Sequence, residues 1–240
     1  MKPSVKTIEA DVLVIGAGGA GMYAAIEAAR QLGPDARVVL ADRSLIGRGG
    51  ATIMAQMTVA VAMGHQQDDH WEHHFNDTLT AGRGLCDPAL ARLLCEQGPA
   101  AIRELDDWGV GWARQDGRNG TPGSTVPMRQ AHAPGHDRPR CVYVDFLNTG
   151  PAVSKTLRAQ LNRMPNIQRI GDLLVTQLIC EAGACVGAVA LDISAGTPVR
   201  LNAKATVVAT GGLTRLYARN SASANMGGDG YALCLAAGAP

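Results

Sequence analysis

A glycine-rich turn with the spacing of a phosphate-binding loop follows an apolar run near the start of the sequence. Gly16, Gly18 and Gly21 come directly after residues 11–15, and the alanine-rich segment 22–31 follows. The first glycine allows a tight turn, the second lets backbone approach a pyrophosphate, and the third lets helix and strand pack closely. The helix N-terminus adds N–H groups and the positive end of the helix dipole. The pattern predicts a dinucleotide site, with a ligand-free strand–helix–strand unit as the alternative.

A carboxylate follows the second apolar run of the sequence. Residues 37–41 form this run, and Asp42 stands 21 residues after Gly21. A dinucleotide-binding fold places the acid that binds a ribose hydroxyl at about this distance, roughly 20 residues on. The glycine turn and Asp42 together predict a pyrophosphate contact and a ribose contact for one nucleotide.

Basic side chains gather in residues 115–140, a stretch rich in glycine and proline without an apolar period. Loops of this length in compact domains are often functional. Guanidinium groups pair well with carboxylates, and histidine titrates near neutral pH. The stretch is either a contact surface for an anionic substrate or a solvated basic loop. Its basic residues include His132, His136, Arg129, Arg138 and Arg140.

Histidines and cysteines offer two further kinds of chemistry. His70 and His74 lie one turn apart in a predicted helix, but no third ligand has suitable spacing, so we expect no metal site. The six cysteines form no C-x-x-C pair and no zinc spacing. They are expected to be buried or free thiols in a reducing compartment.

The first half of the chain has the pattern of an α/β fold. Residues 11–42 predict a strand, a helix and a strand, and 44–64 a glycine-rich loop that leads into a short helix. Gly98-Pro99 is expected to break or kink the second of three longer helices. Those helices are predicted at 69–79, 88–108 and 148–163.

The pattern changes to period-two alternation after the last helix. Short turn segments separate the alternating runs, which predict an antiparallel meander followed by one apolar strand. A meander that returns to a parallel strand is unlike a pure nicotinamide-binding fold and favours a flavin. The predicted strands are 173–180, 184–194, 198–204 and 205–209.

The overall composition excludes several classes of partner. The 240 residues carry 22 Lys and Arg against 21 Asp and Glu, a net charge of +1, without a long charged run. We therefore expect no nucleic-acid partner. The N-terminus lacks the apolar core of a signal peptide, and residues 53–63 are too short to span a bilayer. These features predict a cytoplasmic protein without direct membrane insertion.

An ordered set of short motifs covers essentially the whole sequence. The motifs are Gly16–Gly21, Gly50-Ala51-Thr52 with Ala55-Gln56, Asp77-Thr78 with Gly82, Leu85 and Asp87, Leu105, Gly109, Trp112-Ala113-Arg114, Asp145 with Thr149-Gly150, Ala209–Gly212 and Gly227–Gly230. On these motifs, the chain resembles the FAD-binding part of the succinate dehydrogenase/fumarate reductase flavoprotein family, which includes L-aspartate oxidase. The fold implied is α/β, a Rossmann-like parallel sheet with helices on both faces and a small antiparallel meander.

The resemblance implies an FAD site with contributions from four segments. Asp42 is expected to hold the adenosine ribose, the loop 48–52 to run along the flavin, and Asp229 to close on its ribityl side. Backbone donors in glycine-rich turns suit flavin heteroatoms, where charge on the reduced ring must be stabilised. The residues implied are Gly16, Gly18, Gly19, Ala20, Gly21, Asp42, Arg43, Gly49, Gly50, Ala51, Thr52, Ala209, Thr210, Gly211, Gly212 and Asp229.

The family also implies a domain organisation and a reaction. Residues 11–64 and 148–240 would form the dinucleotide and flavin core of one FAD-binding domain, with 65–147 as a helical and loop insertion. The reaction implied is hydride transfer between flavin N5 and a small dicarboxylate or enoate. An NAD-dependent dehydrogenase is a rival that leaves the meander unexplained.

Candidates for the substrate side are weaker. Trp112 stands where relatives have an aromatic residue over the substrate, although a simple core position is the alternative. His132 and Arg140 are the other substrate-side candidates, from the basic loop.

Two departures from the family pattern limit what the chain is expected to do. Ala51 occupies the position of the histidine that is covalently joined to the flavin in membrane-bound members, so we expect non-covalent FAD. Met57-Thr58 replaces a glycine pair that normally follows Gln56. This second replacement alters the substrate side of the same loop.

The family's capping domain and catalytic histidines and arginine are expected downstream of Pro240. On this interpretation the 240 residues alone would be inactive, either as a flavin-binding fragment or as half of a split enzyme. A separate chain would then supply the capping domain or act as the electron-transfer partner.

Overall fold

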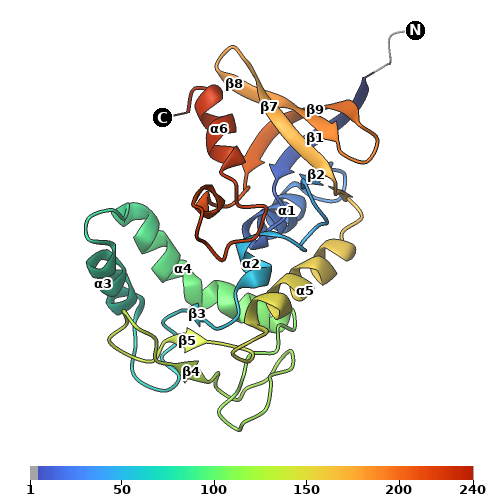
Figure 1. Cartoon of the computed structure of the whole chain (residues 1–240). Helices are drawn as coiled ribbons and strands as arrows, with labels where there is room; N and C mark the ends of the chain where they lie inside the picture. Colours follow the sequence, from blue (N-terminus) through green and yellow to red (C-terminus); the bar gives the residue numbers. More distant parts are fainter. Residues whose placement is uncertain (1–4, 240) are drawn as a thin grey trace. The chain divides into compact units, whose positions relative to one another are not determined.

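The structure, a computed structural model, describes residues 5–239, which fold into two compact units. Unit 1 comprises the described residues of Met1–Met54 and Leu157–Pro240, and unit 2 is the intervening segment Ala55–Thr156. The chain enters unit 2 once and returns to unit 1 within helix α5 (Thr149–Asn162), as Figure 1 allows the reader to trace.

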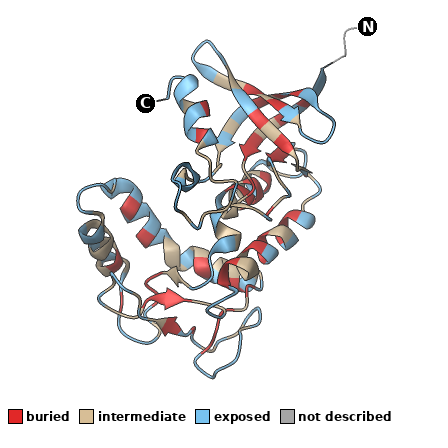
Figure 2. Cartoon of the chain, viewed as in Figure 1, coloured by how far each residue is buried: buried red, intermediate tan, exposed pale blue. Residues whose placement is uncertain are grey.

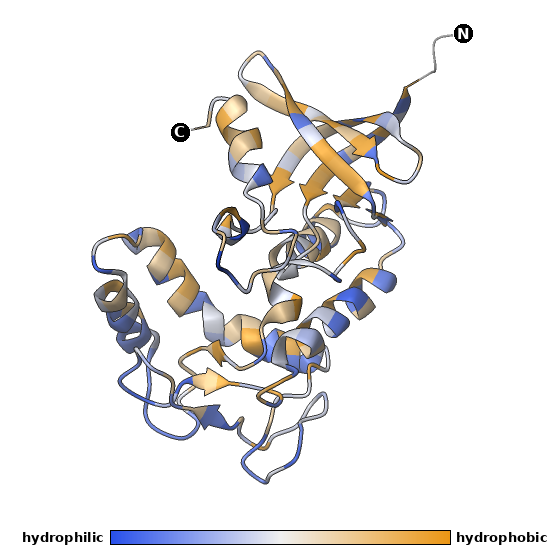
Figure 3. Cartoon of the chain, viewed as in Figure 1, coloured by the Kyte–Doolittle hydropathy of each residue, from blue (hydrophilic) through white to orange (hydrophobic). Residues whose placement is uncertain are grey.

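A six-stranded mixed sheet forms the centre of unit 1. In spatial order its strands are β6 (Ile167–Ile170), β2 (Val38–Ala41), β1 (Lys6–Ile15), β9 (Thr197–Val208), β8 (Ala184–Asp192) and β7 (Leu173–Glu181). The first four are parallel to one another, whereas β8 and β7 continue the sheet in antiparallel fashion. Strands of this sheet are predominantly hydrophobic, as Figure 3 shows. The predicted α/β fold class with an antiparallel meander is confirmed.

Strand β9 belongs to both halves of this sheet. The sequence predicted a meander strand at 198–204 and a separate apolar strand at 205–209, and the structure joins them into one strand. Along one edge β9 pairs in parallel with β1, and along the other it pairs antiparallel with β8. No turn residue separates Lys204 from Ala205, so pairing with β1 continues past this step, whereas pairing with β8 extends only to Asn202.

The helices of unit 1 follow the ends of parallel strands. Helix α1 (Gly19–Leu32) follows β1, the short α2 (Gly50–Met54) lies after β2, and α6 (Asp229–Ala236) comes after β9 and the 3₁₀ turn η1 (Thr214–Leu216). Buried apolar residues from β1, β2, β7, β8 and β9 form the main core, to which α6 adds Leu233. Figure 2 shows this buried layer along the strands.

Unit 2 is built from helices, a small sheet and long connections. Its sheet contains β3 (Val59–Ala60), β5 (Cys141–Val142) and β4 (Gln130–Ala131), all antiparallel. Helices α3 (Trp71–Gly82) and α4 (Pro88–Asp107) pack against each other. The core of the unit surrounds Trp112, which is completely buried among apolar side chains.

Helix α4 corrects one expectation from the sequence. Gly98-Pro99 was expected to break or kink it; a break does not occur, because the helix continues on both sides of the proline. Cys95 and Ile102 are buried one turn before and one turn after Pro99. Apolar packing of both flanks therefore outweighs the loss of one backbone hydrogen bond.

The termini of the predicted helices are otherwise close to those observed. α3 begins at Trp71 rather than at position 69, because His70 has extended backbone angles. Along residues 5–239, no helix has the length and apolar character that crossing a bilayer requires.

Candidate functional site

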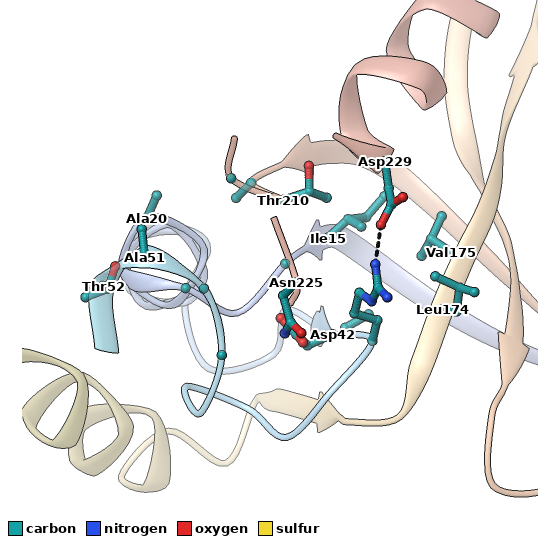
Figure 4. A pocket seen from close by; sticks show the side chains of 18 of the residues that line it. Ile15, Ala20, Asp42, Ala51, Thr52, Leu174, Val175, Thr210, Asn225 and Asp229 are labelled. Carbon is teal, nitrogen blue, oxygen red and sulfur yellow. Dashed lines mark hydrogen bonds and ion pairs between the residues drawn. The ribbon is translucent and has the colours of Figure 1, made fainter. Parts of the chain in front are cut away.

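A pocket in unit 1 opens at the carboxyl ends of the parallel strands β1, β2 and β9. Ile15, Ala41 and Ala209, at or just after these ends, all line it. In open α/β sheets this edge is where ligands bind. Figure 4 shows the pocket between the first turn of α1, the α2 segment, β7 and the start of α6.

Two glycines of the first turn are required by the protein itself. Gly16 has φ of +101°, and a Cβ there would overlap the backbone of Ala209. A Cβ on Gly21 would overlap the carbonyl oxygen of Gly16. These glycines let β1, β9 and α1 approach closely, as the glycine spacing predicted.

Gly18 differs from both of these glycines. It lines the pocket, its φ is an ordinary −71°, and a Cβ there would meet no protein atom within 4 Å. Neither strain nor crowding inside the protein explains a glycine at this position. The empty space beside it is the cradle that a closely approaching ligand would fill.

The N-terminus of α1 faces this cradle. Gly18, Gly19 and Ala20 line the pocket, the N-cap residue Gly18 has no side chain to cap the helix, and the first turn carries no acid. One amide is held within the protein, since Gly19 N donates to Thr52 Oγ1 at 3.0 Å. A 14-residue helix with its positive end open to a pocket provides a site for phosphate oxygens.

Asp42 joins the first turn to the end of β2. Its Oδ2 accepts a hydrogen bond from Ala17 N at 2.6 Å, and its Oδ1 accepts from Ser44 N and Ser44 Oγ, both at 2.8 Å. The carboxylate also lines the pocket. Because each carboxylate oxygen can accept more than one hydrogen bond, Asp42 can still receive hydroxyl groups from a ligand.

The opposite wall comes from α2 and the segment before α6. Gly50 N donates to Ser223 Oγ at 3.2 Å, and Asn225 Nδ2 donates to Ser44 Oγ at 2.7 Å. These bonds hold the segment that contains Ala51 against the pocket. No histidine side chain is available at Ala51 for a covalent bond to a ligand.

One ion pair crosses the pocket. Arg43 Nη1 lies 2.5 Å from Asp229 Oδ2, and the dashed line in Figure 4 marks this contact. Both side chains are partly exposed, at 41% and 45%. Asp229 is the first residue of α6, where a carboxylate is favoured by the helix dipole.

Nearly all the residues implied by the family resemblance meet at this pocket. Only Gly21 and Gly212 are not in its lining, and Gly21 lies behind the turn, against Gly16. Sequence reasoning missed a polar side chain, Asn225, and the apolar wall of the pocket. Asn225 stands two residues before the predicted Gly227–Gly230 segment, so its position was the available signal. The lining residues not predicted are Ile15, Ala41, Leu173, Leu174, Val175, Asn225 and Leu233.

The substrate-side candidates lie in unit 2, in three different environments. Trp112 is completely buried, and no partner of its indole N–H occurs among residues 5–239. His132 is exposed, and its Nε2 lies 2.7 Å from the carbonyl oxygen of His136. Arg140 is completely buried.

Arg140 is surrounded by three carboxylates. Its guanidinium nitrogens lie 3.3 Å from Asp69 Oδ2, 3.1 Å from Asp77 Oδ2 and 2.6 Å from Asp137 Oδ1. The pKa of Asp69 is raised overall, because the effect of burial exceeds the opposing effect of the positive charges of Arg140 and Arg138. The guanidinium is thus engaged inside unit 2.

Histidines beside this network remain neutral near pH 7. Burial, together with the nearby charge of Arg140, lowers the pKa of His74 from 6.5 to about 4. Burial and Arg140 also lower the pKa of His136, whose ring lies 5.7 Å from that of His74. His70, in contrast, is exposed beside Asp68. Within the described part of the chain, no three His, Cys, Asp or Glu side chains are grouped to hold a metal ion.

Comparison with known proteins agrees with the geometry of unit 1. The family model described as "FAD binding domain" matches residues 11–240. The fumarate reductase flavoprotein subunit of Escherichia coli strain K12 is 31% identical over 236 residues, which cover 98% of this chain and 37% of that protein. L-aspartate oxidase of Pseudomonas aeruginosa is 32% identical over 234 residues, covering 95% of this chain and 42% of that protein.

A solved structure shows the same relation in three dimensions. The Mycobacterium smegmatis Sdh1 structure in complex with UQ1 has a TM-score of 0.87 and 32% identity, and covers 97% of this chain. The match covers 39% of the Sdh1 chain, so the present chain spans well under half the length of these relatives. The predicted family resemblance is confirmed: the chain belongs to the FAD binding domain family.

Proposed function

We propose that the chain holds FAD non-covalently in the pocket of unit 1, as the FAD-binding part of an oxidoreductase of the fumarate reductase type. The cradle beside Gly18 carries this proposal, because it is the one glycine of the turn that the protein does not need for its own packing. An oxidised flavin accepts a hydride at N5, which is the chemistry the cofactor supplies when bound.

The residues of the pocket suit separate parts of the cofactor. The open N-terminus of α1 would bind the pyrophosphate, and Asp42 would accept hydrogen bonds from ribose hydroxyl groups. The segment with Ala51 and Thr52 and the turn at Thr210 would line the flavin. Alanine at position 51 supports non-covalent binding, because it has no nucleophilic or leaving group to form the linkage.

The names of the relatives also support a substrate class and a type of partner. We infer a small dicarboxylate or enoate as substrate, supported by relatives named fumarate reductase and L-aspartate oxidase. Several relatives are named as flavoprotein subunits, which supports an electron-transfer or capping partner chain. We also propose that residues 1–240 act as one FAD-binding domain with unit 2 as its insertion, in a cytoplasmic protein.

Titration with FAD and with NAD tests the cofactor. We expect the purified chain to take up FAD with a change in flavin absorbance, and NAD to leave the protein unchanged. Acid precipitation should release the flavin into the supernatant, whereas flavin retained on the precipitate would contradict non-covalent binding.

The substitution Gly18→Ala gives the most specific test of the site. The new methyl group meets no protein atom, so we expect unchanged thermal stability of the free protein and at least about tenfold weaker FAD binding, which corresponds to about 1.4 kcal/mol. Gly21→Ala is the contrasting variant, because its methyl group overlaps Gly16 and should lower both stability and binding. If Gly18→Ala bound FAD as tightly as the unaltered chain, the pyrophosphate would not lie in the cradle.

Turnover distinguishes an active enzyme from a flavin-binding fragment. Steady reduction of fumarate by a reduced dye, measured with the FAD-loaded chain, would support an active oxidoreductase. A loaded chain that binds FAD without turnover would support the alternative of an inactive fragment or one half of a split enzyme.

A further inference from the structure

Two cysteines face each other at the tip of the β7–β8 hairpin. Cys180 in β7 and Cys185 in β8 are register partners in this antiparallel ladder. All six cysteines are free thiols, and only this pair is opposed across a ladder of the described strands. Cys180 is exposed and Cys185 is half-buried.

The turn of the hairpin determines whether Cys180 and Cys185 form a hydrogen-bonded or a non-hydrogen-bonded pair of the ladder. Ala182 and Gly183 connect the strands with positive φ angles of 49° and 81°, the pattern of a two-residue type I′ turn. In such a hairpin the residues that flank the turn, Glu181 and Ala184, form a hydrogen-bonded pair, so the next pair outward is of the non-hydrogen-bonded kind.

Non-hydrogen-bonded pairs have the spacing that a disulfide requires. Their Cα atoms lie about 4.5 Å apart, within the range of roughly 4.4–6.8 Å usual for disulfides. Both side chains also project from the same face of the sheet, because directly opposite residues share a face.

A β-bulge directly beyond the cysteine pair joins the register set by the turn to the register of the rest of the ladder. Ile179 pairs with Gly187, whereas Cys180 pairs with Cys185, so Val186 is an extra residue in β8. If the outer register of Ile179 with Gly187 continued to the tip without a bulge, Val186 rather than Cys185 would lie opposite Cys180, and the thiols would be offset along the ladder.

The two thiol groups interact directly. Burial raises the pKa of the Cys180 thiol, and the neighbouring Cys185 raises it further, both as a charge and through a hydrogen bond between the side chains. Cys185 Sγ also donates to the carbonyl oxygen of Gly187 at 3.6 Å, so the register pairing and the effect of Cys185 on the pKa of Cys180, rather than a covalent bond, place the two thiols beside each other in the reduced protein. A raised thiol pKa also slows oxidation at neutral pH, because the thiolate is the reactive form.

We propose that Cys180 and Cys185 form a reversible cross-strand disulfide, a redox-sensitive modification site at the hairpin tip. The oxidant is a small-molecule disulfide such as oxidised glutathione. One cysteine thiolate attacks a glutathione sulfur, breaking its S–S bond and releasing one glutathione thiolate. The second cysteine thiolate then attacks the mixed disulfide and releases the other.

The reaction is balanced without any other reactant. The protein loses two protons and two electrons and gains one S–S bond, and the oxidised glutathione becomes two thiols. This site is independent of the proposed flavin chemistry. The disulfide would link the end of β7 to β8, whereas the first three residues of β7 line the pocket at the opposite end of the strand.

Peptide mapping of the native chain tests the disulfide. The chain is equilibrated with mixtures of reduced and oxidised glutathione at about pH 8, where thiolates are more abundant, and is then quenched with acid and alkylated. Trypsin releases both cysteines, and no other cysteine, in the single peptide 170–200. We expect oxidation to make this peptide lighter by two hydrogen atoms, without alkylation, and dithiothreitol to reverse the change.

The glutamate between the two cysteines allows a second, independent measurement of the disulfide by protease cleavage. A protease that cleaves after Glu181 divides the reduced peptide into two, whereas a disulfide holds the two pieces together. Cys180→Ser and Cys185→Ser should each abolish the linked product. Cys234→Ser, a half-buried cysteine of α6 in the same unit, is the matched control and should leave it unchanged.

The hairpin geometry is tested by comparing folded with urea-unfolded protein. In the same glutathione mixture, we expect the ratio of disulfide to dithiol to be at least about tenfold higher in the folded chain, because the fold holds the sulfurs together. An equal or lower ratio in the folded chain would overturn the proposal. So would cysteines that carry separate glutathione groups, or a disulfide that links two chains.

Discussion

Unit 1 and unit 2 satisfy their polar groups in different ways. The pocket of unit 1 is lined mainly by backbone, small residues and apolar side chains, with a few polar groups such as Asp42 and Asn225. Its only ion pair among the described residues, Arg43 with Asp229, is partly exposed. Unit 2 buries Arg140 completely and surrounds it with three carboxylates. One unit leaves polar groups open at a pocket, while the other pairs its charges internally.

The two units differ in what supplies the interaction partners of their polar groups, the protein itself or a ligand. A buried charge without a partner is very unfavourable, so a charge inside a core must be paired by the protein itself. Helix amides at an open pocket need no protein partner, because water accepts their hydrogen bonds until a ligand replaces it. Polar groups of unit 1 are therefore expected to act in binding, and those of unit 2 in folding.

Removal of the buried cation should have the largest effect. We expect Arg140→Met to lower the free energy of unfolding by about 3–5 kcal/mol, because it leaves the buried carboxylate of Asp69 without its buried cation and with only Arg138 nearby, at 3.8 Å. Urea unfolding followed by tryptophan fluorescence measures this directly, since Trp71, Trp108 and Trp112 all lie in unit 2.

An exposed ion pair in the same unit is the control for Arg140. Arg92 pairs with Glu96 on the surface of α4, with side-chain exposures of 62% and 49%. Arg92→Met should cost less than about 1 kcal/mol. Equal costs for the two variants would show that burial does not distinguish these charges, and the comparison between the units would fail.

Acid should weaken unit 2 through His74. Its pKa of about 4 in the folded protein lies below the ordinary value of 6.5, so the unfolded chain binds the proton more readily. The resulting stability is complete above pH 6.5 and is lost as the pH falls to about 4, by up to about 3 kcal/mol. Asp69 has a raised pKa and acts in the opposite direction.

A pair of histidine variants isolates this contribution. His74→Gln should flatten the decline in stability between pH 6.5 and about 4, measured by tryptophan fluorescence in urea. His70→Gln removes an exposed histidine just before the same helix and should keep the original slope. Parallel curves for the His74 variant and the unaltered chain would rule out this role of His74.

The ion pair at the pocket of unit 1 should matter least. Arg43→Met is expected to change the stability of the FAD-free chain by less than about 1 kcal/mol, because both partners are partly exposed to water. Thermal unfolding monitored by circular dichroism gives this value, and added salt should reduce the difference further. A cost as large as that of Arg140→Met would mean that charges are structural in both units.

The pocket of unit 1 was largely predictable because its residues are tied to local motifs. Gly16, Gly18 and Asp42 follow buried strands directly, so strand positions and glycine spacing place them at one edge of the sheet. Asn225 and the wall formed by Leu173–Val175 were not predicted. Leu173–Val175 reach the pocket through strand order, which has no short-range signal, whereas the only signal for Asn225 was its place beside Gly227–Gly230.

Unit 2 shows the limit of reasoning from residue types. Arg140 and Trp112 have side chains that suit a substrate site, yet both are completely buried within the unit. Their partners Asp69, Asp77 and Val61 are distant along the chain. Only a folded chain shows whether a basic residue faces water, a ligand or a carboxylate.

The sequence by itself determined the family, the strand–turn–helix at the first glycines and most of the pocket lining, because these depend on neighbours in the chain. Tertiary structure decided the rest. It united two predicted strands into β9, kept α4 helical through Pro99, paired Arg140 with its carboxylates and set Cys180 opposite Cys185. Each of these outcomes depends on contacts between separated segments, whose packing and pairing energies exceed local preferences.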